Sequence, residues 1–203
     1  MRPRLAIALA LAAVLAGLLV AGCGGSAPTY TGLVRKPAPE VGALALRDAT
    51  QAGKPLSFRA APKGLLLVFF GYTQCPDVCP TTLSDLGVAV RGLQPDEQAR
   101  IQVAFVSVDP RRDTPAVLRG YIRSFFSKGH ALRTDDAKQL AAVAKAFGAA
   151  YRVTTDAKGA VDVVHSSFTY AVDDAGTLRL QWGFGTTKKA FADDLRALLK
   201  HAA

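Results

Sequence analysis

Hydrophobic positions along the chain form two kinds of run, which predict buried strands alternating with amphipathic helices. Residues 65–70 are apolar at every position and residues 101–108 nearly so, as is typical of strands covered on both faces. Residues 81–93 instead place Leu83, Leu86 and Val90 on one side at helical spacing. Because a crossover between neighbouring strands of one sheet is right-handed, these two strands are predicted to be parallel.

The rest of the pattern completes a single domain. The further predicted elements are a hairpin over 41–58, a helix from Thr114–Pro115 to about Phe126, a helix opened by Asp135 or Asp136 and ending at Phe147, strands over 161–172 and 177–182, and a final helix over 188–201. The Asp173–Gly176 stretch is a typical hairpin turn between the last two strands. The order predicts an α/β fold, a thioredoxin-like three-layer sandwich with an added β-hairpin, over residues 40–203.

The first 22 residues have the pattern of an export signal. Arg2 and Arg4 precede an apolar run over 5–20, which ends in Val20-Ala21-Gly22-Cys23. This ending resembles a bacterial lipobox, so we expect a lipoprotein signal peptide over 1–22, cleavage before Cys23 and lipid on Cys23. The alternative is an uncleaved transmembrane anchor, because the run approaches the length that spans a bilayer. Either way the domain is expected to be anchored to a membrane of the bacterial cell envelope, on the periplasmic side.

Residues 23–39 are rich in Gly, Ser, Ala, Pro and Thr, which predicts a lipid-anchored flexible linker. The chain carries a net charge of +9; without Arg2 and Arg4, 23 basic residues stand against 16 acidic ones, a net charge of +7. The sequence has no compact Lys/Arg run and no basic stretch interleaved with aromatics, so nucleic acid is not an expected partner. The charge favours anionic lipid or an acidic protein.

Lipidation of Cys23 leaves one thiol pair, Cys75 and Cys79, at the junction between a buried strand and a helix. The dipole and free N–H groups of a helix start favour negative charge, so we expect lowered thiol pKa values and reactive thiolates. The C-x-x-x-C spacing lets two sulfurs converge on one ion and still allows a disulfide. The site is therefore a metal clamp, a redox switch or both. A purely structural disulfide is the alternative, although so short a loop gains little from closure.

His165 follows the apolar strand residues Val163 and Val164, and the predicted sheet order could bring it beside the cysteine loop. Two thiolates and one imidazole suit copper, since sulfur favours Cu(I) and nitrogen stabilises Cu(II). A closed zinc site usually needs a fourth protein ligand, and no obvious one is available. His130 and His201 are expected to be exposed and are not assigned to the site.

Two aspartates follow the neighbouring strand. Asp109 is expected near the mouth of the site, where its carboxylate would orient a ligand or bias a thiol without binding metal. Asp113 is expected beside it in the same supporting role, and the local alternative is that Asp113 or Thr114 caps the following helix.

Three stretches together carry a family resemblance: GYTQCPDVCP over 71–80, SVDPRRDTP over 107–115, and VHS over 164–166. In this order, behind a membrane tether, they resemble the Sco/SenC family of copper-binding cytochrome c oxidase assembly proteins. The resemblance implies a thioredoxin-like fold and copper ligation by Cys75, Cys79 and His165. One departure is Gln74, where many relatives have a histidine; this puts only the fine tuning of the site in doubt.

The resemblance implies delivery of copper to, or reduction of cysteines in, the binuclear copper site of an oxidase subunit. The leading hypothesis is a membrane-tethered chaperone that carries one Cu(I) or Cu(II), with that subunit, other copper chaperones or thiol reductants as partners. The alternative is a thiol–disulfide reductase, in which Cys75 attacks a target disulfide and Cys79 resolves the intermediate. A peroxidase on the same fold is a distant third hypothesis, since nothing beyond the thiols argues for it. A purely structural domain, with the two cysteines as a staple, is the non-functional alternative.

Overall fold

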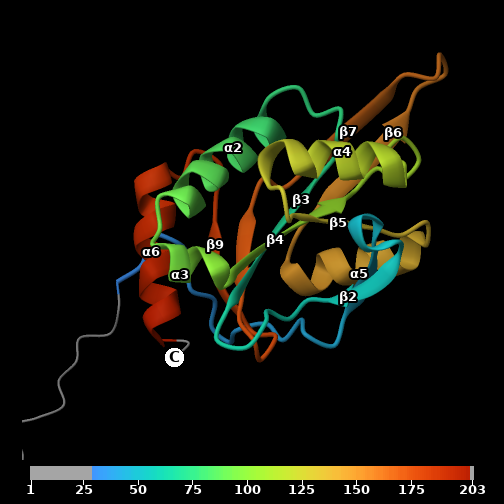
Figure 1. Cartoon of the computed structure of the whole chain (residues 1–203). Helices are drawn as coiled ribbons and strands as arrows, with labels where there is room; N and C mark the ends of the chain where they lie inside the picture. Colours follow the sequence, from blue (N-terminus) through green and yellow to red (C-terminus); the bar gives the residue numbers. More distant parts are fainter. Residues whose placement is uncertain (1–28, 202–203) are drawn as a thin grey trace, which may run out of the picture.

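One seven-stranded mixed sheet forms the centre of the protein, and helices cover both of its faces (Figure 1). The computed structural model describes residues 29–201; the expected signal peptide and Cys23 lie outside this range. The strand order is β2-β1-β5-β4-β3-β8-β9, and β6 and β7 form a separate two-stranded ribbon. Within the described range, no helix has the length and apolar character needed to cross a bilayer.

The elements follow one another closely along the chain. The strands are β1 (Ala45–Asp48), β2 (Lys54–Ser57), β3 (Leu65–Gly71), β4 (Ile101–Ser107), β5 (His130–Arg133), β6 (Tyr151–Thr155), β7 (Val161–His165), β8 (Thr169–Val172) and β9 (Leu178–Trp182). The helices are η1 (Ala49–Gln51), α2 (Val78–Arg91), α3 (Pro95–Ala99), α4 (Pro115–Phe125), α5 (Ala137–Phe147) and α6 (Lys188–His201).

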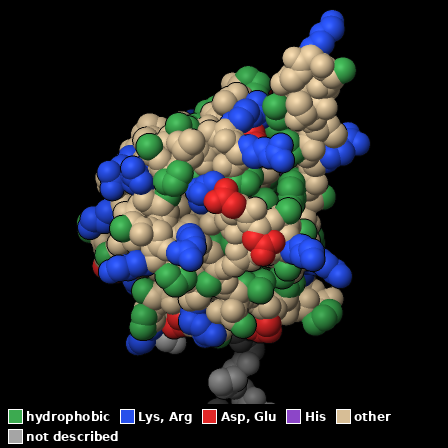
Figure 2. Space-filling model, turned by 90° about the vertical axis from the view of Figure 1, so that its right-hand side faces the viewer, with side chains coloured by type: hydrophobic (Ala, Val, Ile, Leu, Met, Phe, Trp, Pro, Cys, Tyr) green, Lys and Arg blue, Asp and Glu red, His purple; other side chains and the backbone are tan. Residues whose placement is uncertain are grey.

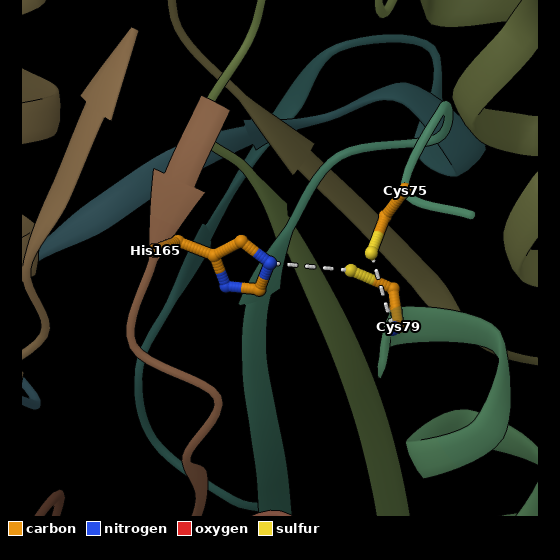
Figure 3. Close-up of side chains that lie close together, drawn as sticks. All are labelled: Cys75, Cys79 and His165. Carbon is orange, nitrogen blue, oxygen red and sulfur yellow. Dashed lines mark hydrogen bonds between the residues drawn. The ribbon is translucent and has the colours of Figure 1, made fainter. Parts of the chain in front are cut away.

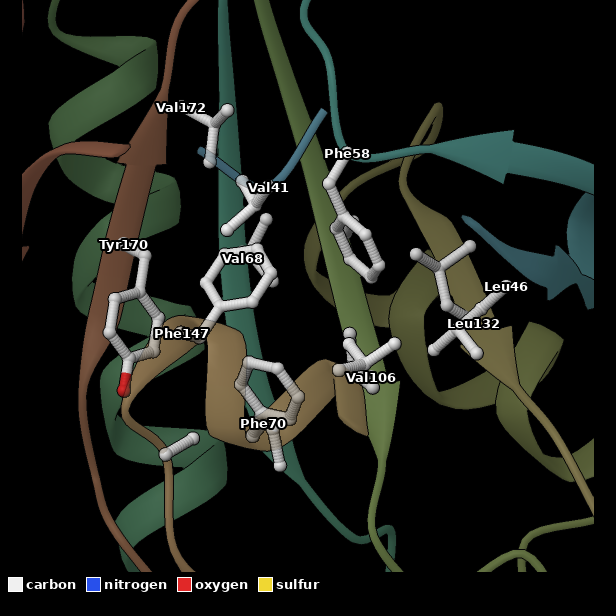
Figure 4. Packing of buried hydrophobic residues seen from close by; sticks show 14 of the residues in the cluster. Val41, Leu46, Phe58, Val68, Phe70, Val106, Leu132, Phe147, Tyr170 and Val172 are labelled. Carbon is white, nitrogen blue, oxygen red and sulfur yellow. The ribbon is translucent and has the colours of Figure 1, made fainter. Parts of the chain in front are cut away.

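The central strand β3 organises the three layers. It pairs in parallel with β4 and antiparallel with β8, and all seven of its residues are buried. Because strand side chains alternate between faces, Val68 and Phe70 point to the layer of α5, where Phe70 packs on Phe147 (Figure 4). Leu67 points to the other face, among residues of α2 and α6, and Phe69 contacts residues of α2 and α4. The predicted three-layer sandwich is therefore confirmed.

Helix α2 begins earlier than predicted, at Val78 rather than at Thr81. Pro80 lies in its first turn, where the missing N–H of proline costs no intrahelical hydrogen bond. The correction matters because it puts Cys79 inside the helix and Cys75 in the loop before it.

The single strand predicted over 161–172 is wrong. Residues 161–165 form β7, which pairs with β6, whereas residues 169–172 form β8 in the main sheet. Residues 166–168 between them belong to neither strand, although the backbone N–H of Ser166 still donates to the carbonyl of Ala150. The ribbon of β6 and β7 stands out from the body of the protein (Figures 1 and 2). Its two strands are mostly exposed, so they lack the buried run that revealed the central strands.

The expected flexible linker is wrong for its later part, because residues 31–35 are bound to the domain. The backbone N–H groups of Thr31 and Gly32 donate to the Asp194 carboxylate, at 3.0 and 2.8 Å. Leu33 forms a backbone bridge with Gln181, and Arg35 donates to the carbonyl of Phe147. The buried carboxylate of Asp194 and the open edge of strand β9 thus hold this segment. Neither contact can be recognised from the local amino-acid composition of the segment.

Candidate metal centre

Three side chains from three separate elements converge at one end of the sheet (Figure 3). Cys75 comes from the loop after β3, Cys79 from the first turn of α2, and His165 from the end of β7. One ligand atom from each, the two Sγ atoms and a ring nitrogen, all lie within 4.8 Å of one another. Among the described residues, this is the one group of three or more such donors.

The first turn of α2 sets the position of the two sulfurs. The backbone N–H of Cys79 donates to the Sγ of Cys75 at 3.3 Å, which holds the loop sulfur against the helix start. The Sγ of Cys79 lies 3.5 Å from the Nε2 of His165. No disulfide joins the two cysteines, so each sulfur is available to bind a metal as a thiolate.

The expected lowering of the thiol pKa values is wrong for Cys79. Its side chain is fully buried, and burial raises the pKa of this thiol far above its ordinary value; the neighbouring Cys75 raises it further. The helix start does not compensate, because loss of hydration disfavours the thiolate more strongly than a partial positive charge favours it. Cys79 is therefore a protonated thiol until a cation replaces its proton.

His165 is oriented so that one ring nitrogen faces the sulfur of Cys79. Its Nδ1 lies 3.1 Å from the carbonyl oxygen of Ser166, and since that oxygen only accepts, Nδ1 carries the proton. The unprotonated Nε2 therefore faces Cys79. The rings of Phe69 and Tyr72 stand edge-on to the imidazole, at centroid distances of 6.1 and 5.8 Å. Burial lowers the pKa of His165, which keeps the imidazole neutral and able to donate its lone pair.

Asp113 ties the cysteine loop to β4. Its carboxylate accepts hydrogen bonds from the Thr73 hydroxyl and the Ser107 hydroxyl, both at 2.6 Å, and from the Thr73 backbone N–H at 3.2 Å. Burial raises the pKa of Asp113, although these three bonds oppose the rise. Thr114, and not Asp113, caps helix α4, because the Thr114 hydroxyl accepts a hydrogen bond from the Val117 N–H. Asp113 therefore contacts the cysteine loop through Thr73 and the end of β4 through Ser107.

Asp109 acts through an arginine and not directly on the thiols. Its buried carboxylate pairs with Arg112, whose guanidinium donates to the Gln74 side chain at 3.1 Å and lies 5.7 Å above the ring centre of Tyr72. Gln74 and Tyr72 both belong to the loop that carries Cys75. The pair of Asp109 and Arg112 therefore positions the part of the loop that contains Tyr72 and Gln74.

The expectation that His130 lies exposed in a polar loop is wrong. His130 begins β5, and its Nδ1 lies 2.7 Å from a carboxylate oxygen of the buried Asp48. Asp48 also accepts from Thr50 and from the Ala131 backbone N–H. The four-residue strand β5 was too short to detect from its pattern. Asp48, the partner of His130, is 82 positions away in the chain. As expected, His130 is not part of the three-donor group.

The chain is similar to known proteins in both sequence and structure. A family model described as SCO1/SenC matches residues 46–200. The chain is 41% identical over 114 residues to a SCO2-like protein from Rickettsia prowazekii, an alignment that covers 55% of each chain. The solution structure of apo Sco1 from Thermus thermophilus superposes with a TM-score of 0.73 at 33% identity, covering 86% of this chain and 99% of the other.

A second solved structure, Bradyrhizobium japonicum ScoI with copper bound, superposes with a TM-score of 0.66 at 29% identity. It covers 76% of this chain and 96% of that one. The curated relatives are longer than the matched part. The alignments span 63% of a putative copper-binding protein from Stutzerimonas stutzeri, which is 33% identical over 129 residues, and 55% of the Rickettsia protein. Sequence and structural comparisons thus lead to the same group of proteins.

Proposed function

The chain belongs to the SCO1/SenC family, and from this premise we propose that it is a membrane-tethered copper chaperone that binds one copper ion through Cys75, Cys79 and His165. Its role would be to supply copper for the binuclear copper site of a cytochrome c oxidase subunit. The observation that carries the proposal is the convergence of two thiols and an unprotonated imidazole nitrogen within 4.8 Å.

The chemistry of the donors supports copper as the cargo. Two cysteine sulfurs are soft ligands that favour Cu(I), and a neutral imidazole extends the set to Cu(II). Among the described residues, the donor group offers no fourth Cys, His or carboxylate, which is what a closed zinc site usually requires. A set of three leaves a position open for a ligand from an acceptor protein, which a chaperone needs and a storage site does not.

Release by stepwise ligand exchange follows from the unequal burial of the donors. Cys75 is 9% exposed whereas Cys79 is fully buried, so an incoming acceptor thiolate would displace Cys75 first. The high pKa of Cys79 helps the last step, because a proton readily replaces the metal on this sulfur. Binding takes up the ion and releases the Cys79 proton; release reverses both.

A thiol–disulfide reductase is the second candidate, and the contrast between the two thiols supports it. Cys75 is the more exposed sulfur, and its Sγ accepts a hydrogen bond from the backbone N–H of Cys79. The Cys75 thiolate would attack a target disulfide and expel one target thiolate. Cys79, losing its proton, would then attack the mixed disulfide and expel the second. The target gains two electrons and the chain keeps a Cys75–Cys79 disulfide.

The location and partners are part of the same proposal. A cleaved signal over 1–22 with lipid on Cys23 would hold the domain at a membrane of the bacterial envelope, on the side outside the cytoplasm. There the oxidase subunit that receives copper, and chaperones or thiol reductants that recharge the site, are the expected partners. The packing of residues 31–35 against the domain supports a short tether, which would keep the site near the membrane.

The test is a copper titration of the chain from Ser26 onward, reduced and free of oxygen, with Cu(I) and with Cu(II). We expect one copper per protein and, for Cu(II), a sulfur-to-copper absorption band. His165→Ala should weaken or abolish that band. His130→Ala is the matched control, since this histidine lies outside the donor group and its removal should leave the band unchanged.

If the reduced protein binds no more copper than a variant lacking both thiols, the chaperone proposal fails. A disulfide-exchange assay then separates the remaining readings: turnover that needs both cysteines indicates the reductase, and no turnover indicates a structural pair.

A further inference from the structure

A second surface, distant from the metal centre, has the composition of a docking site. On the side of the sheet covered by α2 and α4 lies a groove of about 790 Å³, bounded by α2 and α3 on one wall and by the end of α4 and the start of β5 on the other. Its lining residues include no aspartate and no glutamate. The residues that line the groove therefore contribute no negative charge to it.

Basic side chains stand on both walls of the groove. Arg91 comes from the last turn of α2, while Arg123 and Lys128 come from the end of α4 and the loop after it. All three are exposed, and within residues 29–201 none of them forms an ion pair. Their charges are therefore unneutralised and directed at whatever enters the groove.

Three carboxylates lie beside the groove without lining it. Asp48 is buried beneath its wall, where it is bound by Thr50 and His130. Asp96 and Glu97 lie on α3. Glu97 caps its own helix at the Gln94 N–H and lies 3.9 Å from Arg196. The positive field of the groove is thus not cancelled by its own wall.

The floor between the basic side chains is apolar and partly open. Val90, Ile101 and Phe126 line the groove and are only partly buried, although they pack on the core beneath. His130 closes one end and is held in place by Asp48. An apolar floor flanked by cations on both sides fits an extended segment in which carboxylates alternate with apolar side chains, and not a single inorganic anion.

The groove and the metal centre lie at opposite ends of the parallel strands. Ile101 and His130 begin β4 and β5, whereas Gly71 ends β3 opposite Ser107 at the end of β4. Strands of seven residues span about 20 Å, so one partner can occupy the groove while the cysteines stay accessible to another.

We propose that this groove binds an acidic, partly apolar segment of a partner protein, independently of the copper site. Binding is driven by charge complementarity with Arg91, Arg123 and Lys128 and by burial of apolar side chains on the groove floor. The proposal does not depend on the function of the metal centre, because none of its residues contributes a metal donor.

The experiment uses a short fluorescein-labelled peptide in which glutamate alternates with leucine and phenylalanine, followed by fluorescence anisotropy on the chain from Ser26 onward. We expect saturable binding that weakens as salt screens the charges. Arg91→Glu with Arg123→Glu should weaken binding by about tenfold or more. The matched control is Lys138→Glu with Lys145→Glu on α5, an equal charge change on the other face of the sheet, which should leave affinity within about twofold.

Circular dichroism and an unchanged copper titration would show that both double variants are folded. A peptide with lysine in place of glutamate should not bind. Absence of binding to the glutamate peptide, or equal weakening by the two double variants, overturns the proposal. So does binding of phosphatidylserine vesicles through Arg91 and Arg123 without binding of the peptide, since the groove would then recognise a membrane surface.

Discussion

The Cα of Gly71 lies directly against the sulfur of Cys79: a Cβ built on Gly71 would come within 2.7 Å of that Sγ. The same Cβ would also approach the rings of Phe105 and Phe69, at 3.0 and 3.1 Å. The last residue of β3 therefore has to be a glycine for the buried thiol to reach the position next to His165. Space for the Cys79 sulfur is provided by the absence of a side chain at Gly71.

Gly71→Ala should lower both stability and copper affinity. The methyl group would force Cys79 and the first turn of α2 outward, and overpacking of this kind costs about 1–3 kcal/mol of unfolding free energy. Gly120→Ala is the control, because a Cβ there meets no atom within 4 Å and should stabilise α4 by about 0.5–1 kcal/mol. Urea denaturation and copper titration measure the two effects. Unchanged affinity in Gly71→Ala would show that the sulfur position is not critical.

The two thiols should differ sharply in reactivity. Cys75 is the more exposed, and burial raises the pKa of Cys79, so less of its thiolate is present at neutral pH. Alkylation by iodoacetamide should be faster in Cys79→Ala, which keeps only Cys75, than in Cys75→Ala, by at least about tenfold. Equal rates, or faster reaction of Cys79, would contradict the order of attack given for both proposed functions.

Asp113→Ala should destabilise the domain and loosen the cysteine loop. The substitution leaves the buried Ser107 hydroxyl and the Thr73 N–H without their acceptor, a loss of about 2–4 kcal/mol. Alkylation of Cys75 should accelerate at the same time. Asp135→Ala removes an exposed carboxylate and should change stability by less than about 0.5 kcal/mol. If Asp113→Ala leaves the alkylation rate unchanged, Asp113 does not restrain the loop.

Acid should remove the stabilisation provided by Asp48. Burial alone raises the pKa of Asp48, but hydrogen bonds from His130, Thr50 and the Ala131 N–H outweigh burial and hold the pKa below its ordinary value. The folded state therefore binds this proton less readily than the unfolded state, and stability is present above the unfolded pKa and lost as the pH falls through the folded one.

Asp48→Asn should accordingly be less stable than the wild type by about 1–3 kcal/mol near pH 6, with the gap closing toward about pH 2. Urea denaturation across this pH range measures the gap. Asp193→Asn is the control: its carboxylate is exposed, and although Lys189 lowers its pKa, its loss should leave the acid dependence in place. A gap that stays constant with pH would mean that the charge of Asp48 is not involved.

Asp194 should link the N-terminal segment to the fluorescence of Trp182, the one tryptophan of the chain. Its carboxylate accepts from the Trp182 indole at 2.7 Å and from the Gly32 N–H at 2.8 Å. Asp194→Ala should shift the emission to longer wavelength and lower stability by about 2–4 kcal/mol, because buried donors lose their acceptor. The neighbouring Asp193→Ala should do neither. Unshifted emission in Asp194→Ala would show that the segment stays docked without this carboxylate.

The sequence alone determined the sheet core and the identity of the reactive side chains. Continuous apolar runs such as 65–70 specify strands covered on both faces, since burial depends on composition along a short stretch. The spacing of Cys75 and Cys79 and the lone His165 in its motif identified the candidate donors; that they are copper ligands stays a prediction. Short exposed strands such as β6, and the break after β7, left no such signal.

How these groups behave depends on contacts and burial that exist only in the folded protein. The Cys79 sulfur and the His165 nitrogen are 86 positions apart in the chain, and a separate ribbon brings them together. The sign of the Cys79 pKa shift depends on how much water the fold removes, which outweighs the local helix start. Asp113 and His130 likewise have partners far away in the chain, Thr73 at 40 positions and Asp48 at 82. Local sequence fixes which residues can form an element or bind a metal, whereas burial and long-range contacts fix their charge, orientation and partners.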